Sequence, residues 1–340
     1  MMPLLSKATN ASVDLIPQLG RDGDMVLVVI LKERFFVSRR DRVERVGDAE
    51  IRKADELWDE DEPDKSSVMF PSDVCIRKPS TDVLVVGDAV GPYAPRVKHL
   101  DVLVRVGPVK KLLRVFGTRV WYQRLTSLAL SPPEPFESRP IKWEEAFGGF
   151  DDTDRDKPPL EEPRNPVGRG LARSRASLVD KPGPSVEDPT DLISNDSSRP
   201  TPAGLGALGR HWMPRRQYVG TIDDLWKKER MPLLPVDFDE RYNQLATPEL
   251  ITPSPLQGGE PVEVVNMCAA GALKFNLPRI AFHVGAAYDD GTTKEYRTML
   301  DTVLLLPTSR VVEMTWRTAL LVPRPARKLR TIRVFEKTIL

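Results

Sequence analysis

Proline is the feature that most limits what this chain can fold into. It supplies 32 of the 340 residues, close to twice its usual share of about 5%. Because proline interrupts helix interiors and central strands, few long helices are expected. Hydrophobic residues still make up 40% of the chain, which favours a folded protein over a disordered one. We therefore expect many turns, long ordered loops and only a few short helices.

The strand signals fall in two separate parts of the sequence. The clearest is a β-hairpin, in which residues 99–107 alternate between apolar and polar side chains and residues 111–117 pair with them after a turn. Short helices are expected at 141–150 and 222–228, where acidic residues begin the second helix and lysines end it. No regular alternation of strand and helix supports a parallel sheet. The predicted class is mainly β, with an antiparallel, sandwich-like architecture.

These signals divide the chain into consecutive parts. Residues 1–24 are a polar lead, 25–130 are β-rich, 131–250 are irregular with short helices, and 251–340 are β-rich again. We expect these parts to form one integrated domain over 25–335.

The sequence contains no recognisable catalytic or metal-binding motif. The three histidines lie far apart and no metal-ligand spacing occurs, so neither a metal nor another cofactor is expected. Cys75 and Cys268 are predicted to be free thiols inside apolar stretches. The run GLGALG at 204–209 resembles a dinucleotide-binding loop, but prolines rather than a strand precede it, which favours close backbone packing.

Paired carboxylates are the best remaining enzymatic hypothesis. Asp237 with Asp239, or Glu144 with Glu145, supply the two carboxyl groups that glycoside hydrolysis requires. Asx-type turn bonds around Phe238 are the simpler interpretation of the first pair. We prefer a protein that is not an enzyme and keep a carbohydrate-active enzyme as the alternative.

Residues 204–242, which we call the anchor segment, combine the residue types that dominate binding hot spots. Its irregular pattern is typical of a long ordered loop, and such loops often carry function. The alternative is that the aromatic residues belong to the core and the arginines pair with nearby acids. The candidate partner-binding residues are Trp212, Arg215, Arg216, Tyr218 and Trp226, with Trp143 and Phe147 as a second patch.

Charge and hydropathy narrow the choice of partner and location. The chain has 50 Lys and Arg against 49 Asp and Glu, so it lacks the overall positive charge that favours nucleic acid. No apolar run approaches the roughly 18 residues of a membrane span. We expect a cytoplasmic protein without membrane insertion or a nucleic-acid partner, although a carbohydrate- or nucleic-acid-binding module is a third hypothesis.

Several blocks of sequence, in a fixed order, resemble one bacterial family. They include FPSDVCIRKPSTDVLVVGDA (70–89), KKLLRVFGTRVW (110–121), WEEAFGGFD (143–151), NPVGRG (165–170) and DTVLLLPTSRVVEMTWR (301–317). Together with the anchor segment, they are similar to a domain-of-unknown-function family associated with type VI secretion, over residues 25–333.

This resemblance implies a function but no catalytic residues. Members of that family are typically encoded beside PAAR-like spike-tip proteins and VgrG spike proteins. They are proposed to be adaptors or chaperones that load effectors onto the spike. The resemblance therefore implies a non-enzymatic adaptor or chaperone whose partner is a type VI secretion effector, a PAAR-like protein or a VgrG spike protein.

Overall fold

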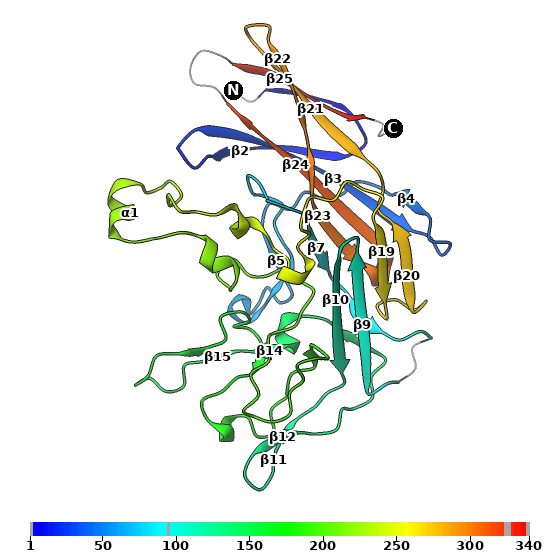
Figure 1. Cartoon of the computed structure of the whole chain (residues 1–340), viewed down its shortest axis with the longest axis vertical. Coiled ribbons are helices and arrows are strands. Elements are labelled where there is room, and N and C mark those ends of the chain that lie inside the picture. The colour runs from blue at the N-terminus through cyan, green and yellow to red at the C-terminus, as the bar shows by residue number, and fades with distance from the viewer. Residues whose placement is uncertain (1–2, 94–95, 323–327, 338–340) are drawn as a thin grey trace.

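Three larger β-sheets form the body of the molecule, and long loops surround them (Figure 1). The computed structural model describes residues 3–93, 96–322 and 328–337. Most strand pairs are antiparallel, and the described residues contain one α-helix, α1 (Asp224–Glu229). The predicted mainly β class with long loops and short helices is confirmed.

The six-stranded sheet forms the centre of the fold. Its order is β2-β3-β24-β23-β7, with β4 paired to the end of β3. The long strands β3 and β24 pair from Val26↔Leu321 to Phe36↔Val311, and β7 lies parallel to β23. The strands are β2 (Ser12–Leu19), β3 (Met25–Val37), β4 (Val43–Arg45), β7 (Asp82–Val85), β23 (Met299–Leu306) and β24 (Val311–Leu321).

The five-stranded sheet has the order β18-β10-β9-β19-β20. The predicted hairpin is confirmed as β9 and β10, which pair from Val106↔Val109 to His99↔Phe116. Their alternate side chains are buried, as the sequence pattern requires. The strands are β9 (His99–Val106), β10 (Val109–Phe116), β18 (Val186–Glu187), β19 (Pro261–Val265) and β20 (Ala272–Asn276).

The four-stranded sheet brings the two ends of the chain together. Its order is β1-β25-β21-β22, and β1 pairs in parallel with β25. The predicted lead, 1–24, therefore contains two strands, β1 and β2, that were not predicted from the sequence. Residues 1–2 of the lead and 338–340 of the C-terminal part lie outside the described residues. The strands are β1 (Leu4–Ala8), β21 (Ala281–Tyr288), β22 (Thr293–Arg297) and β25 (Leu329–Lys337).

Strands from the two β-rich parts of the sequence pair with each other in the six-stranded and five-stranded sheets, and in the four-stranded sheet a strand of the lead pairs with the C-terminal part. β3 pairs with β24, β7 with β23, β9 with β19, and β1 with β25. Side chains of the three sheets form one continuous hydrophobic core. The two β-rich parts are therefore interleaved in space, although the irregular centre separates them in sequence.

The irregular centre folds into short elements around a smaller apolar cluster of Trp121, Leu128, Phe147, Leu178 and Ile193. The two-stranded pairs and 3-10 turns of the centre and of the two β-rich parts are β5 (Glu56–Leu57), β6 (Val68–Phe70), β8 (Asp88–Val90), β11 (Trp121–Gln123), β12 (Leu128–Leu130), β13 (Ser138–Pro140), β14 (Phe147–Gly148), β15 (Phe150–Asp151), β16 (Leu160–Glu161), β17 (Arg169–Gly170), η1 (Pro63–Lys65), η2 (Trp143–Glu145), η3 (Arg175–Ser177), η4 (Arg215–Tyr218), η5 (Glu240–Asn243), η6 (Pro248–Leu250) and η7 (Pro307–Ser309).

The helix predicted at 141–150 is wrong. Only η2 is helical there, and β14 then pairs in parallel with β17. Gly148 has a φ of 153°, and a Cβ at this position would lie 2.1 Å from the carbonyl oxygen of Asn165. The glycine is thus required by the close approach of β14 to the backbone at Asn165, and it does not end a helix.

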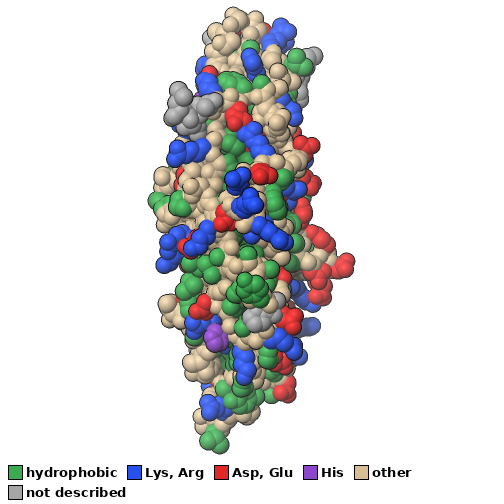
Figure 2. Space-filling view, turned by 90° about the vertical axis from the view of Figure 1, so that its right-hand side faces the viewer, with side chains coloured by type: hydrophobic (Ala, Val, Ile, Leu, Met, Phe, Trp, Pro, Cys, Tyr) green, Lys and Arg blue, Asp and Glu red, His purple; other side chains and the backbone are tan. Residues whose placement is uncertain are grey.

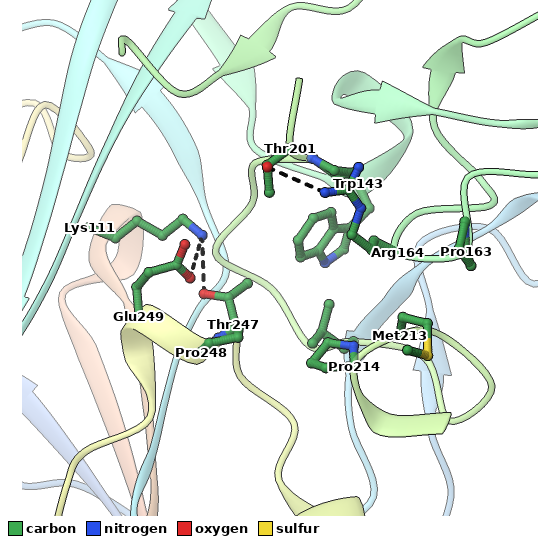
Figure 3. A pocket seen from close by; sticks show the side chains of 12 residues that line it. Lys111, Trp143, Pro163, Arg164, Thr201, Met213, Pro214, Thr247, Pro248 and Glu249 are labelled. Atoms are coloured by element: carbon green, nitrogen blue, oxygen red, sulfur yellow. Dashed lines mark hydrogen bonds and ion pairs between the residues drawn. The ribbon is translucent and has the colours of Figure 1, made fainter. Parts of the chain in front are cut away.

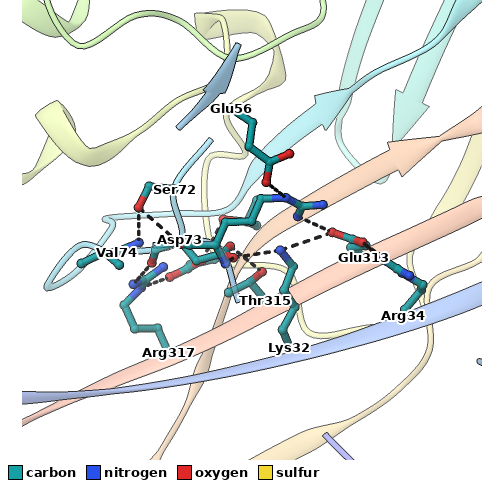
Figure 4. A network of polar contacts seen from close by, with 12 residues as sticks. Lys32, Arg34, Glu56, Ser72, Asp73, Val74, Glu313, Thr315 and Arg317 are labelled. Carbon is teal, nitrogen blue, oxygen red and sulfur yellow. Dashed lines mark hydrogen bonds and ion pairs between the residues drawn. The ribbon is translucent and has the colours of Figure 1, made fainter. Parts of the chain in front are cut away.

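A network of buried charged side chains joins the six-stranded sheet to the loop before β7 (Figure 4). Glu313 of β24 accepts hydrogen bonds from Arg34 at 2.6 Å and Arg52 at 2.7 Å, and lies 3.3 Å from the ammonium of Lys32. Lys32 also donates to Asp73 at 2.8 Å. Burial alone would raise the pKa of Glu313, but the surrounding cations lower it to about 2. Glu313 therefore stays ionised at neutral pH, and the network fixes the loop to the sheet.

The same network continues to Cys75. Arg317 donates to Asp301 at 2.5 Å and to the backbone carbonyls of Asp73 and Cys75 at 2.6 and 2.9 Å. Both cysteines of the chain are free, as predicted. Burial raises the pKa of the Cys75 thiol, which makes this thiol a poor nucleophile at neutral pH.

Glu33 points to the other face of β3, because side chains alternate along a strand. Its side chain is 5% exposed, and its Oε2 lies 3.1 Å from Nε of Arg45. Arg45 also bonds Glu336 of β25 at 2.8 Å. Burial raises the pKa of Glu33 to about 7, against the opposing effect of Arg45 and with a further contribution from Glu336.

The face shown in Figure 2 carries both signs of charge, with Lys and Arg side chains among Asp and Glu side chains and small apolar clusters. This mixture agrees with the net charge of +1. A single-sign field of the kind that attracts nucleic acid is not seen on this face.

Candidate functional site

The anchor segment crosses the core before it reaches the surface. Its first part is buried through Leu205, Leu208 and Trp212. Trp212 packs edge-to-face on Trp143, with ring centroids 5.9 Å apart and an interplanar angle of 88°. The two patches that the sequence analysis named separately therefore meet at this tryptophan pair.

Glycines allow the backbone to lie directly against these two rings. A Cβ at Gly204 would lie 2.8 Å from the Trp143 ring, and one at Gly209 would lie 2.7 Å from Nε1 of Trp212. The glycine-rich run is thus a close-packing loop, as the sequence analysis favoured over a dinucleotide site.

Arg215 holds the two ends of the anchor segment together. The buried guanidinium donates to the carbonyl of Leu208 at 2.7 Å and to that of Tyr242 at 3.0 Å. It also lies 5.2 Å from the centre of the Tyr242 ring. Burial lowers the pKa of Arg215. These contacts give Arg215 a structural role, whereas the neighbouring Arg216 is exposed.

An open cavity of about 390 Å³ lies where the anchor segment meets β10, η2 and η6 (Figure 3). Most of its lining is apolar and conformationally restricted, because prolines supply much of it. The lining residues come from widely separated stretches of the chain. They are Lys111, Trp143, Pro163, Arg164, Thr201, Pro202, Leu208, Met213, Pro214, Thr247, Pro248 and Glu249.

Lys111 is the charged group that is most deeply buried in this lining. It is 8% exposed, and its ammonium lies 3.1 Å from Glu249 and 3.2 Å from the hydroxyl of Thr247. Burial lowers the pKa of Lys111 although Glu249 opposes this effect. The cation is therefore only partly compensated by its protein partners.

Arg164, the second cation of the lining, is paired with a neighbouring carboxylate. It forms a bidentate pair with Glu162 at 2.7 and 2.8 Å, and it donates to the hydroxyl of Thr201 at 3.3 Å. The two cations of the cavity thus differ in their charge partner: Arg164 has a bidentate carboxylate, whereas Lys111 has a single contact with Glu249 and one ammonium proton beyond its two protein bonds.

Beyond Tyr218 the chain leaves the body as a projecting arm, residues 219–238, which contains α1 (Figure 1). Asp237 closes the base of the arm by accepting from the backbone N–H of Thr221 at 2.9 Å and from its hydroxyl at 2.8 Å. Asp223 caps α1 through the N–H of Trp226. The predicted helix at 222–228 is therefore confirmed, with its start two residues later.

Four large apolar side chains of the arm are more than half exposed: Ile222 at 52%, Leu225 at 61%, Met231 at 63% and Val236 at 65%. Exposed apolar residues are ordinary when scattered singly, so the presence of four of them on one projection makes the arm a candidate interaction site. Within the arm, the Trp226 indole donates to the carbonyl of Leu233 at 2.9 Å. Arg230 of the arm also donates to the carbonyl of Arg21, in the turn between β2 and β3, at 2.8 Å.

The predicted site residues fall into two groups. The buried group consists of Trp143, Phe147, Trp212 and Arg215. For Trp212 this agrees with the alternative interpretation, in which the aromatic residues of the anchor segment belong to the core. Tyr218 and Trp226 are half-buried and Arg216 is exposed, so these three remain available at the surface. Tyr218 lies under the guanidinium of Arg241, whose carbon is 4.3 Å from the ring centre. A binding role for the three surface residues stays a prediction.

Lys111, Met213 and Arg164 line the cavity but were not predicted as site residues from the sequence. One signal was present for Lys111, because it occupies an inward position between the buried Val109 and Leu113 of an alternating strand. A lysine at such a position needs a buried partner or a cavity. No local pattern points to the other two residues.

Each carboxylate of the enzymatic hypothesis is engaged elsewhere. Asp237 closes the arm, and Asp239 accepts from the backbone and side chain of Arg241 at 2.9 Å each. These bonds lower the pKa of both groups. Glu144 bonds the backbone N–H and the hydroxyl of Ser67 at 2.7 and 2.8 Å, and Glu145 pairs with two arginines, Arg139 and Arg169.

Across residues 3–93, 96–322 and 328–337, no group of three or more His, Cys, Asp or Glu side chains is placed to hold a metal ion. In the same part of the chain, no helix is both long and apolar enough to cross a membrane.

Fold and site together define a mainly β protein whose long loops present an open apolar cavity and a projecting apolar arm. The chain matches the family described as "Uncharacterized protein conserved in bacteria (DUF2169)" over residues 22–317, and it belongs to this family. Comparison with curated proteins and with solved structures finds no match.

Proposed function

We propose that this protein is a non-enzymatic adaptor or chaperone that binds a type VI secretion effector, or a PAAR-like or VgrG spike protein, in the cytoplasm and helps to load the effector onto the spike. The observation that carries the proposal is the arm, on which four large apolar side chains are exposed. The type VI assignment is supported by the resemblance of the sequence blocks. Membership of the DUF2169 family is compatible with it.

The arrangement suits a scaffold that holds a partner without changing it. The buried network around Glu313 and the shared core make the body rigid. The arm and part of the cavity lining belong to the anchor segment. Rigid scaffolds that present loops are a common basis for protein recognition. The arm offers exposed apolar side chains and the half-buried Trp226, and tryptophan is enriched at interface centres.

The carbohydrate-active alternative receives less support. A retaining or inverting glycosidase needs two free carboxyl groups about 5 to 10 Å apart across a cleft. The four candidate carboxylates instead bond backbone amides, hydroxyls or arginines. We therefore favour the adaptor.

Capture of partners from the native cytoplasm tests the proposal. The tagged native protein is compared with Leu225→Asp, which places a charge on the arm, and with the matched control Leu125→Asp. Leu125 is fully exposed in the turn between β11 and β12, away from the arm (Figure 1). Both changes should alter the free energy of unfolding by no more than about 0.5 kcal/mol.

Mass spectrometry of the captured proteins gives the result. We expect a PAAR-like, spike or effector protein in near-equal amount with the native protein and with Leu125→Asp, and its loss with Leu225→Asp. Failure of the native protein to retain any secretion protein would refute the adaptor function. Equal capture by both variants would remove the arm from the interface.

A further inference from the structure

The cavity combines walls that suit an aromatic ring with one incompletely compensated cation. Met213 and Trp143 line it together with Pro214 and three further prolines. Methionine sulfur and indole rings both make favourable contacts with aromatic groups. Figure 3 shows Lys111 on one side of the cavity, and Trp143, Met213 and Pro214 on the other.

Electrostatics then select the charge of the ligand. Two bonds of the Lys111 ammonium go to Thr247 and Glu249, which leaves one of its three protons for a ligand. The side chain of Glu249 is about half exposed, so it is able to turn toward solvent when another carboxylate arrives. An anion beside Lys111 would compensate a buried cation, whereas a ligand cation would add to the charge that burial already disfavours.

We propose that this cavity binds an aromatic side chain of a partner protein, with a carboxylate next to the ring that accepts a hydrogen bond from Lys111. The occupant is therefore a peptide segment in which an aromatic residue stands beside an acidic residue. The proposal rests on the adaptor function for the source of the segment, and it specifies the chemistry that the adaptor recognises.

The direct test uses a small probe on the full-length protein. The probe is 3-phenylpropanoate, which carries a ring and a carboxylate, and the control is its uncharged amide, 3-phenylpropanamide. Methyl NMR of protein labelled on its nine methionines reports the site, with the Met213 signal assigned from Met213→Leu. We expect the Met213 methyl signal to shift on titration with the acid, and binding of the amide to be at least about tenfold weaker.

Three variants locate the effect at Lys111. Lys111→Met should reduce affinity for the acid to that for the amide, while the matched control Lys110→Met, the exposed neighbour on the other face of β10, should leave both unchanged. Glu249→Gln removes the competing carboxylate and should strengthen acid binding by a few fold. Equal binding of acid and amide to the native protein, or no shift at Met213, overturns the proposal even if a variant fails to fold.

The outcomes separate this inference from the adaptor function. Loss of partner capture in Leu225→Asp, with unchanged capture in Lys111→Met, would uphold the adaptor and overturn the cavity as the recognition site. A selective shift at Met213 in a protein that captures no secretion component would uphold the ligand chemistry and refute the adaptor. Loss of capture in Lys111→Met but not in Lys110→Met supports both.

Discussion

Replacement of Glu33 by glutamine should stabilise the protein, and only above acidic pH. Burial between β3, Arg45 and Glu336 raises the pKa of Glu33 from 4.5 to about 7. Since a tenfold change in an equilibrium corresponds to about 1.4 kcal/mol, ionising this carboxyl costs the folded state about 3 kcal/mol. Glutamine has nearly the same shape and cannot ionise, so Glu33→Gln should raise the free energy of unfolding by about that amount at pH 8.

The sign follows from proton binding. Between pH 4.5 and about 7 the folded protein binds a proton at Glu33 that the unfolded chain releases. The free energy of unfolding of the native protein therefore falls as pH rises through this window. Below it both states are protonated, and the difference between native protein and Glu33→Gln should vanish.

Urea unfolding at pH 4.5, 6 and 8 measures the effect. Glu44→Gln is the matched control, because Glu44 is an exposed carboxylate on the neighbouring strand β4. A variant Glu33→Gln that is less stable than the native protein at pH 8, or a difference that does not change with pH, would refute the reasoning.

Three further predictions concern the body of the protein. Glu313→Gln leaves buried cations without their carboxylate and should lower the free energy of unfolding, measured in urea at pH 7, by about 3 to 5 kcal/mol. The control Glu56→Gln, at the exposed end of the network, should lower it by less than about 1 kcal/mol. Because the pKa of Glu313 is about 2, its contribution is present above pH 4.5 and is lost as pH falls toward 2. Arg215→Ala should lower the free energy of unfolding by about 2 kcal/mol or more, because two backbone carbonyls lose their donor. Arg216→Ala should change it by less than about 0.5 kcal/mol. Similar thermal unfolding of the two variants would contradict the structural role of Arg215. Gly204→Ala should lower the free energy of unfolding by about 1 to 3 kcal/mol, because the added Cβ meets the Trp143 ring at 2.8 Å. Gly206→Ala, whose nearest contact is 3.7 Å, should be tolerated. Equal melting temperatures of the two variants would argue against this packing.

The elements that were predicted correctly from the sequence have their signals within short stretches of the chain. The β9–β10 hairpin has strict alternation, and α1 has an acidic cap and terminal lysines, so short windows were sufficient. The strand β2 was missed because it is a partly exposed edge strand that contains Pro17, which is atypical of a central strand. At 141–150, two glycines resembled a helix end but serve a close backbone contact.

The candidate site was predicted only in part, for a physical reason. Trp143 and Trp212 were identified by residue type, but residue type does not say which of them the core buries. The cavity is assembled from stretches between Lys111 and Glu249 that meet only in the folded chain. The helix of the arm was predicted from the sequence at 222–228. The exposure of the apolar side chains of the arm depends on how the arm projects from the folded body, which the sequence does not show.

The interleaving of the two β-rich parts has a consequence for how the protein is made. A ribosome completes β3 and β9 long before their partners β24 and β19, and β1 pairs with β25, the last described strand. Until then the growing chain carries unpaired strand edges that favour aggregation. Folding must therefore be largely post-translational, and a chain cut short before Val311 lacks the strand that β3 requires. Premature termination should yield insoluble fragments, and no independently folded N-terminal half should accumulate.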